Sequence, residues 1–174
     1  MVTNSFSEKI INWYELHGRH DLQWRKAITP YRIWISEIML QQTQVVTVKP
    51  YFKKFIKKYP TLKSIQDASE DEILTLWSGL GFYKRARNIF QTKEIIHSEH
   101  KGRFPKTFEE IIKLPGIGKS TAGAIMSIAH QIPTPILDGN VKRILQRYFS
   151  DDKNIFSEKE LWNLSLSVSI ATNS

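Results

Sequence analysis

The sequence predicts an all-α fold, on two observations. Apolar residues recur with helical spacing along nearly the whole chain, and no run shows the alternation of apolar and polar residues that is typical of a strand. In addition, a Ser or Thr is followed three residues later by Glu at three places, which is the capping box that begins a helix. The three pairs are Ser69 with Glu72, Thr107 with Glu110, and Ser157 with Glu160.

The helices can be placed from the residues that break them. Pro30 opens a helix that runs through SEIMLQQ, and Pro50 is expected to interrupt or restart it. The pair Gly79 and Gly81 ends the helix that Ser69 begins. Further helices are expected over about residues 83–97, 119–130 and 140–149.

Composition limits the class of protein. The 174 residues are 41% hydrophobic, which is enough for one domain with a core. No apolar run approaches the roughly 18 residues of a membrane span, and the N-terminal residues lack the pattern of a signal peptide. The chain has no cysteine, which excludes disulfides, thiolate metal sites and cysteine nucleophiles. We therefore expect a cytoplasmic protein without a membrane partner.

The formal net charge of +8 suits a polyanionic partner, and nucleic acid is the commonest one. A solvated basic face is the alternative explanation of the same charges. The basic residues gather in three segments, which are Lys53, Lys54, Lys57 and Lys58; Lys84, Arg85 and Arg87; and Lys142, Arg143 and Arg147.

Residues 114–123 read LPGIGKSTAG and resemble the end of a P-loop, but the context does not fit. A P-loop needs a glycine where Lys113 stands and a strand before it, whereas TFEEIIKL is a capped helix. The sequence therefore predicts a helix–turn–helix. Gly116 and Gly118 would let the backbone amides at the second helix's N-terminus approach a DNA phosphate. A purely structural turn is the alternative.

Glu37 is the first candidate for chemistry. Its helical neighbours at three and four positions are Ile33, Trp34, Leu40 and Gln41, none of which is basic. We expect an apolar pocket that raises the pKa of Glu37 and keeps it partly protonated near neutral pH, as a general acid requires. A glutamate at the edge of the core is the alternative.

Asp138, in PILDGNVKR, is the second candidate. It precedes a helix and would cap it, and the helix amides would keep its carboxylate ionised. One carboxyl group pushed towards neutral and another held ionised is the pattern that cleaves glycosidic bonds. A simple capping residue explains Asp138 equally well, because the sequence alone does not bring the two carboxyl groups together.

The segment QQTQ interrupts an otherwise apolar helix. Its amide side chains would fill the gap left by a flipped base or contact base edges, unless they merely end the helix. Among the tryptophans, Trp24 is the best candidate for a pocket wall. The five histidines show no metal-like grouping with carboxylates.

Together these motifs resemble the adenine DNA glycosylases of the MutY family, within the helix-hairpin-helix glycosylase superfamily. SEIMLQQTQV, PYF, LWSGLGFYKRARN, FPKTFEEIIKLPGIGKSTAGAI and PILDGNVKR stand in family order over about residues 5–165. The resemblance implies a six-helix domain at 29–149 with its hairpin at 114–119. Residues 1–28 and 150–174 would form part of a second helical domain. It also implies a monomer that removes adenine mispaired with 8-oxoguanine or guanine from double-stranded DNA without cutting the strand.

The resemblance further implies a role for each matching residue. Glu37 would protonate adenine, Asp138 would oppose the oxocarbenium-like sugar, and Asn140 would orient that site. An alkali-type cation would rest on the hairpin carbonyls of Leu114 and Ile117, with no metal ligand from side chains. The residues around the adenine and in the duplex wedge would be Trp24, Arg25, Leu40, Gln41, Gln42, Thr43, Phe82 and Ser120. Those along the DNA backbone would be Leu114, Gly116, Ile117, Gly118, Lys119, Arg85, Lys142 and Arg143.

Ser120 separates two related activities. The endonuclease III type carries at this position a lysine that forms a Schiff base and cuts the strand. Lys119 cannot replace it, because a helix turns by about 100° per residue. Phe82 stands where the family usually has tyrosine.

The remaining departures concern the end of the chain. The family's 4Fe–4S cluster uses four cysteines in a segment beyond this chain, so no cofactor is expected in it. The helices that normally follow are missing too, and we expect exposed apolar surface on residues 6–16 and 158–170. A catalytically impaired DNA-binding remnant, or an endonuclease III-like glycosylase acting on another base, are the alternative interpretations.

Overall fold

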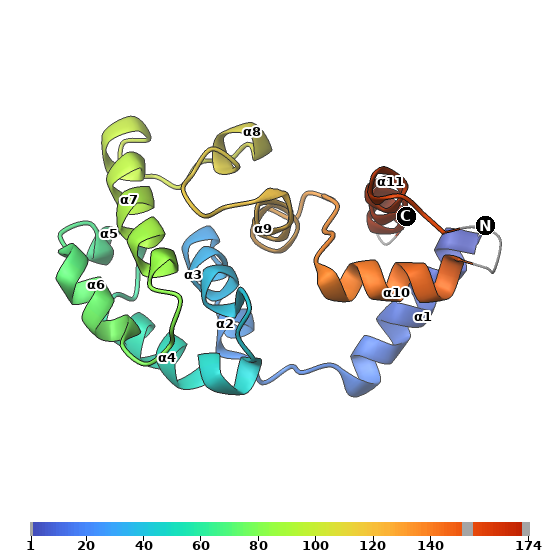
Figure 1. Ribbon diagram of the computed structural model, residues 1–174, viewed down its shortest axis with the longest axis horizontal. Helices are drawn as coiled ribbons and strands as arrows, with labels where there is room; N and C mark the ends of the chain where they lie inside the picture. The colour runs from blue at the N-terminus through green and yellow to red at the C-terminus, as the bar shows by residue number, and fades with distance from the viewer. Residues whose placement is uncertain (1, 151–154, 172–174) are drawn as a thin grey trace.

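The computed structural model describes residues 2–150 and 155–171, and these form helices joined by turns, without a strand (Figure 1). The predicted all-α fold is therefore confirmed. The elements are α1 (Val2–His17), α2 (Gln23–Lys26), α3 (Pro30–Leu40), α4 (Val45–Lys58), α5 (Leu62–Ile65), α6 (Glu70–Trp77), α7 (Lys84–Glu99), α8 (Phe108–Ile111), α9 (Lys119–Ala124), the π-helical turn η1 (Ile125–Ala129), α10 (Gly139–Phe149) and α11 (Glu158–Ala171).

The predicted caps begin their helices. The Ser69 hydroxyl accepts a bond from the Glu72 amide at 3.2 Å, and the Glu72 carboxylate accepts one from the Ser69 amide at 3.0 Å. Ser157 and Glu160 form the same reciprocal pair before α11. The Thr107 hydroxyl likewise accepts from the amide three residues on, at the start of α8. Local sequence therefore defines these helix starts.

The expectation that Pro50 interrupts a helix is wrong. The break lies at residues 41–44, where Gln42 takes a φ of 54°, and α4 then runs through Pro50. Pro50 removes only the bond that its nitrogen would donate to the Val46 carbonyl. Val46 is 70% exposed, so water can serve that carbonyl and the helix continues.

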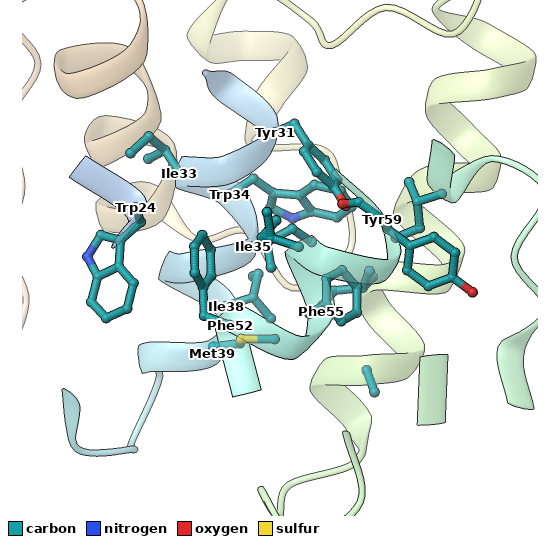
Figure 2. Close-up of a cluster of buried hydrophobic side chains, with 14 of the residues drawn as sticks. Trp24, Tyr31, Ile33, Trp34, Ile35, Ile38, Met39, Phe52, Phe55 and Tyr59 are labelled. Carbon is teal, nitrogen blue, oxygen red and sulfur yellow. The ribbon is translucent and has the colours of Figure 1, made fainter. Parts of the chain in front are cut away.

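Most of the core lies between α2 and η1. Trp34, Trp77, Phe52 and Phe55 are fully buried there, and Figure 2 shows part of this larger cluster. Trp24 belongs to it, because its ring meets Phe52 edge to face with the centroids 5.2 Å apart. This packing fixes α3, which carries Glu37, in the centre of the fold.

A smaller cluster joins the two ends of the chain. Phe6 of α1, Leu145 of α10 and Leu161 of α11 are buried together, on the side of the molecule away from α4–α7 (Figure 1). The Ser7 hydroxyl also donates to the Val168 carbonyl at 3.2 Å. The predicted division placed α10 in the six-helix domain, but its apolar face packs in this smaller cluster. The division at 149 stays a prediction.

Apolar side chains remain exposed on the two helices that bring the chain ends together, as expected. Trp13 and Leu16 of α1 are exposed, and so are Leu166 and Ile170 of α11. No helix in residues 2–150 or 155–171 has the length and hydropathy of a membrane span.

Replacing Phe52 with Ala should lower the free energy of unfolding by about 3–5 kcal/mol, because it deletes a fully buried ring. The same change at Phe82, whose side chain is 59% exposed, should cost at most about 1 kcal/mol. Urea unfolding followed by circular dichroism measures both. Equal losses would contradict the different burial of the two rings.

Candidate active site

Glu37 lies half-buried on α3, and the helix is fixed at its start by the Thr29 hydroxyl, which accepts from the Arg32 amide at 3.2 Å. The pKa of Glu37 is raised to about 7. Burial is the main cause, the negative charge of Asp138 adds to it, and the Arg25 guanidinium opposes both effects. Asp138 therefore lies near enough for its charge to act on Glu37, which the sequence alone could not show. The expected rise in the pKa of Glu37 through burial is found, while an apolar pocket around it stays a prediction.

Asp138 caps the N-terminus of α10. Its Oδ1 atom accepts from the amide of Asn140 at 2.9 Å and from that of Val141 at 2.8 Å. The side chain is exposed, and the helix terminus at which it lies favours negative charge. Asn140 thus contributes its backbone amide to the site. A role for its side chain stays a prediction.

Two serines fix the loop that carries Asp138. The Ser165 hydroxyl of α11 donates to the Ile136 carbonyl at 2.7 Å and accepts from the Ile136 amide at 3.2 Å. The Ser120 hydroxyl of α9 accepts from the Leu137 amide at 3.1 Å. Ser120 therefore positions the residue next to Asp138. Ser165 was not predicted, because a serine within an ordinary amphipathic helix carries no distinguishing pattern.

Arg25 and Trp24 lie on the short helix α2 before α3. Arg25 donates to the Tyr14 hydroxyl at 3.0 Å and stacks on its ring, so α1 orients the guanidinium that acts on Glu37. Trp24 is only 5% exposed and belongs to the core. Its predicted place in the wall of an adenine pocket stays a prediction.

The turn between α3 and α4 carries the residues predicted to form a wedge in the duplex, and that role stays a prediction. Leu40 is half-buried at the end of α3, and Gln42 is exposed with a positive φ. Gln41 donates through its Nε2 atom to the Gly116 carbonyl at 3.1 Å, which joins this turn to the hairpin. The Thr43 hydroxyl closes the turn by donating to the Gln41 carbonyl at 3.2 Å. This link between wedge and hairpin was not predicted.

The hairpin has the predicted helix–turn–helix form, between α8 and α9. Leu114 and Ile117 are buried in the larger cluster and anchor the turn. Gly116 has a φ of 77° and a Cβ there would collide with the Asn88 side chain, so glycine is required. Gly118 caps α9 and leaves open space above its backbone. The phosphate grip and the cation on the Leu114 and Ile117 carbonyls stay predictions.

The basic residues divide into two groups. Lys142 and Arg143 are exposed on α10, and Lys119 is exposed with its Nζ atom 5.9 Å from the Trp162 ring centre. Arg85 corrects the prediction of a phosphate contact. It is 6% exposed, and its guanidinium donates to backbone carbonyls inside the protein, so it cannot reach DNA.

The residues of this chain do not fit the iron–sulfur cluster that the resemblance implies. The sequence contains no cysteine, and the described residues hold no group of three His, Cys, Asp or Glu side chains that would bind a metal. A cavity of about 630 Å³ lies elsewhere, between α1, η1, α10 and α11. It is mainly apolar and includes neither Glu37 nor Asp138, so we do not assign chemistry to it.

A family model described as "HhH-GPD superfamily base excision DNA repair protein" matches residues 35–165, which include Glu37, the hairpin and Asp138. The chain belongs to the HhH-GPD superfamily. This HhH-GPD chain is 53% identical over 173 residues to the adenine DNA glycosylase of Buchnera aphidicola subsp. Acyrthosiphon pisum, covering 97% of the chain and 49% of the relative. It is 38% identical to the human adenine DNA glycosylase, covering 92% of the chain and 32% of the relative. It spans about half the length of its Buchnera relatives.

Solved structures agree with this HhH-GPD fold. A thermostable thymine-DNA glycosylase has a TM-score of 0.87 and 28% identity, with 98% of this chain and 82% of that chain covered. A trapped endonuclease III–DNA covalent intermediate has a TM-score of 0.77 and 22% identity, with 95% and 79% covered. At that identity the second match shows the fold alone.

Glu37→Gln should stabilise the protein in a pH-dependent way. The folded chain binds more protons than the unfolded one between the ordinary pKa of 4.5 and about 7. Stability from Glu37 is therefore present below pH 4.5 and is lost as the pH rises through about 7. The variant should unfold with a free energy roughly 1–3 kcal/mol higher than wild type at about pH 8, and nearly equal at about pH 4.

Denaturant unfolding at the two pH values measures this difference, with Glu99→Gln as a matched change at an exposed glutamate. A difference between Glu37→Gln and wild type that does not depend on pH would contradict the raised pKa.

Proposed function

We propose that the chain is a monofunctional DNA glycosylase that hydrolyses the N-glycosidic bond of adenine mispaired with 8-oxoguanine or guanine. The observation that carries this proposal is the carboxyl pair, in which Glu37 has a pKa of about 7 and is coupled to Asp138 at the N-terminus of α10. The choice of adenine is supported by identities above 50% to proteins that bear the name adenine DNA glycosylase.

The chemistry follows from the two environments. A protonated Glu37 donates its proton to a ring nitrogen of the flipped adenine, which lets the base leave with the electrons of the glycosidic bond. The sugar becomes positively charged, and the Asp138 carboxylate opposes that charge. Addition of water then gives an abasic site and free adenine. The reaction is expected to end at the abasic site without cutting the strand. Ser120 has no amine that could form a Schiff base, and its hydroxyl accepts a hydrogen bond from the Leu137 amide.

Double-stranded DNA is the partner in this proposal. Gln42 and Phe82 would enter the duplex as a wedge, and Thr43 would accompany them. The open backbone at Gly118 and the exposed Lys119 would hold a phosphate, helped by a cation on the hairpin carbonyls. The chain would act as a monomer on cytoplasmic DNA.

A single-turnover assay tests the activity, using a duplex with one adenine opposite 8-oxoguanine. Wild type should produce strand breaks only after alkali, which reveals abasic sites. Glu37→Gln should be about 10²–10⁴-fold slower, while Glu99→Gln should match wild type. The wild-type rate should fall as the pH rises above about 7, because the general acid is then ionised.

Binding without base loss in the wild type would overturn the proposed activity and favour a DNA-binding role. A second duplex carries thymine opposite guanine, because the thymine-DNA glycosylase shares the fold at 28% identity. Thymine release that exceeds adenine release would reassign the substrate base.

Lys142→Ala combined with Arg143→Ala should weaken binding to any duplex, because both side chains are exposed on the helix that Asp138 begins. Each lost phosphate contact should reduce the slope of log K against log salt by about 1. Fluorescence anisotropy at several salt concentrations measures the slope. An unchanged slope, equal to that of a Lys54→Ala control, would remove these two residues from the interface.

A further inference from the structure

A buried arginine connects the two turns that carry the proposed wedge. Arg85 lies in the first turn of α7, and its Nη1 atom donates to the carbonyls of Ile38, Met39 and Gln41 at 3.2, 2.8 and 2.6 Å. The carbonyls of Ile38 and Met39 lie in the last turn of α3, where no further turn of the helix can satisfy them, and the Gln41 carbonyl follows at its C-cap.

The other arm of the guanidinium serves the second turn. Its Nη2 atom donates to the Leu80 carbonyl at 3.4 Å and the Gly81 carbonyl at 3.2 Å, in the turn after α6. The guanidinium carbon lies 5.2 Å from the centre of the Phe82 ring and 5.4 Å from that of Trp77. One planar group therefore contacts both turns at once, which only a forked donor can do.

The charge of Arg85 has no carboxylate partner among the salt bridges of the described residues, whereas the nearby Arg87 pairs with Glu70 at 3.3 Å. A buried cation without an ion pair is costly and depends on its hydrogen bonds. Burying the Arg85 cation without an ion pair costs free energy, so stability alone gives little reason for an arginine at this position. The two turns that its hydrogen bonds connect supply a further reason.

Each turn presents one exposed residue other than glycine in the left-handed region of the backbone. Gln42 has a φ of 54° and Phe82 a φ of 49°, and neither is glycine. Such conformations persist only where the surroundings impose them. Gln42 follows directly on the Gln41 carbonyl, and Phe82 on the Gly81 carbonyl, so both lie one residue beyond a bond from Arg85.

We propose that Arg85 is a positioning residue that joins the turns at Gln42 and Phe82 into one rigid wedge. The proposal rests on the proposed function for its effect on DNA, but the coupling of the two turns is a property of the free protein. Gln41 also donates a hydrogen bond to the hairpin at Gly116. Through Gln41, the Arg85 guanidinium would therefore fix the position of the wedge relative to the hairpin.

Hydrogen exchange of the free protein tests the coupling. In Arg85→Lys, amides of residues 39–44 and 79–83 should exchange about 10-fold faster together, while those of α4 stay unchanged. Arg87→Lys, the same change at an exposed position, should leave both turns at the wild-type rate. Faster exchange in only one turn would overturn the proposal.

Phe82→Gly provides a second route that does not depend on whether Arg85→Lys folds. The fold should tolerate this change, because the ring is exposed and glycine readily adopts a positive φ. The change also removes the Phe82 ring that lies beside the Arg85 guanidinium. If the turns are joined, exchange should also rise at residues 39–44. A change confined to 79–83 would show that Arg85 transmits nothing.

With DNA, 2-aminopurine in place of the target adenine reports unstacking by its fluorescence. Arg85→Lys should reduce the unstacking of 2-aminopurine. It should also slow base release from the adenine-containing duplex about 10²-fold, because a misplaced wedge disturbs the geometry of the reacting groups. Its affinity for an undamaged duplex should change less than about 3-fold. Equal losses in affinity and rate would overturn the positioning role. Absence of base release by the wild type would refute the proposed function, and the exchange result would still decide the coupling.

Discussion

The burial of Glu37, to which the negative charge of Asp138 adds, is the constraint on which the proposed site depends. Glu37 is enclosed because the larger cluster fixes α3 in the middle of the fold, and burial alone already favours its neutral form. Asp138 adds a like charge whose effect falls with distance. The position of Asp138 relative to Glu37 depends on the two serine hydroxyls that hold its loop and on α10, which Asp138 caps. Packing of three different helices therefore decides the protonation state of a single carboxyl group.

Arg25 limits how far this coupling can go. Its positive charge favours ionised Glu37 and so opposes the two effects that raise the pKa of this group. Tyr14 of α1 orients Arg25, while Ser165 of α11 holds the Asp138 loop. One residue of α1 and one of α11 thus influence the surroundings of Glu37, through Arg25 and through the Asp138 loop.

Much of the fold and the burial that raises the pKa of Glu37 could be predicted, because caps, helix spacing and side chains one turn away are local properties. The closeness of Asp138 to Glu37 could not be predicted, because it depends on packing between segments about a hundred residues apart in the sequence. Arg85 was misassigned for a related reason. It stands in a basic run, but a helix turns by about 100° per residue, so it points inwards while Lys84 and Arg87 point outwards. Pro50 does not break α4, where it takes away one backbone hydrogen bond beside the exposed residue Val46.

The bond between Ser7 and Val168 has a consequence for the order in which the molecule forms. It spans 161 residues, whereas α3 packs on α4 and α6 packs on α7, which are neighbours in the chain, although α3 also packs on the more distant α9 and η1. Contacts between such distant segments close the largest loops and tend to form late in folding. α11, which carries Ser165, packs on α1 from the other end of the chain, so the bonds that hold the Asp138 loop depend on contact between the two ends. Separation of the chain ends should therefore loosen the Asp138 loop while leaving in place the larger cluster, which contains no residue of α1 or α11.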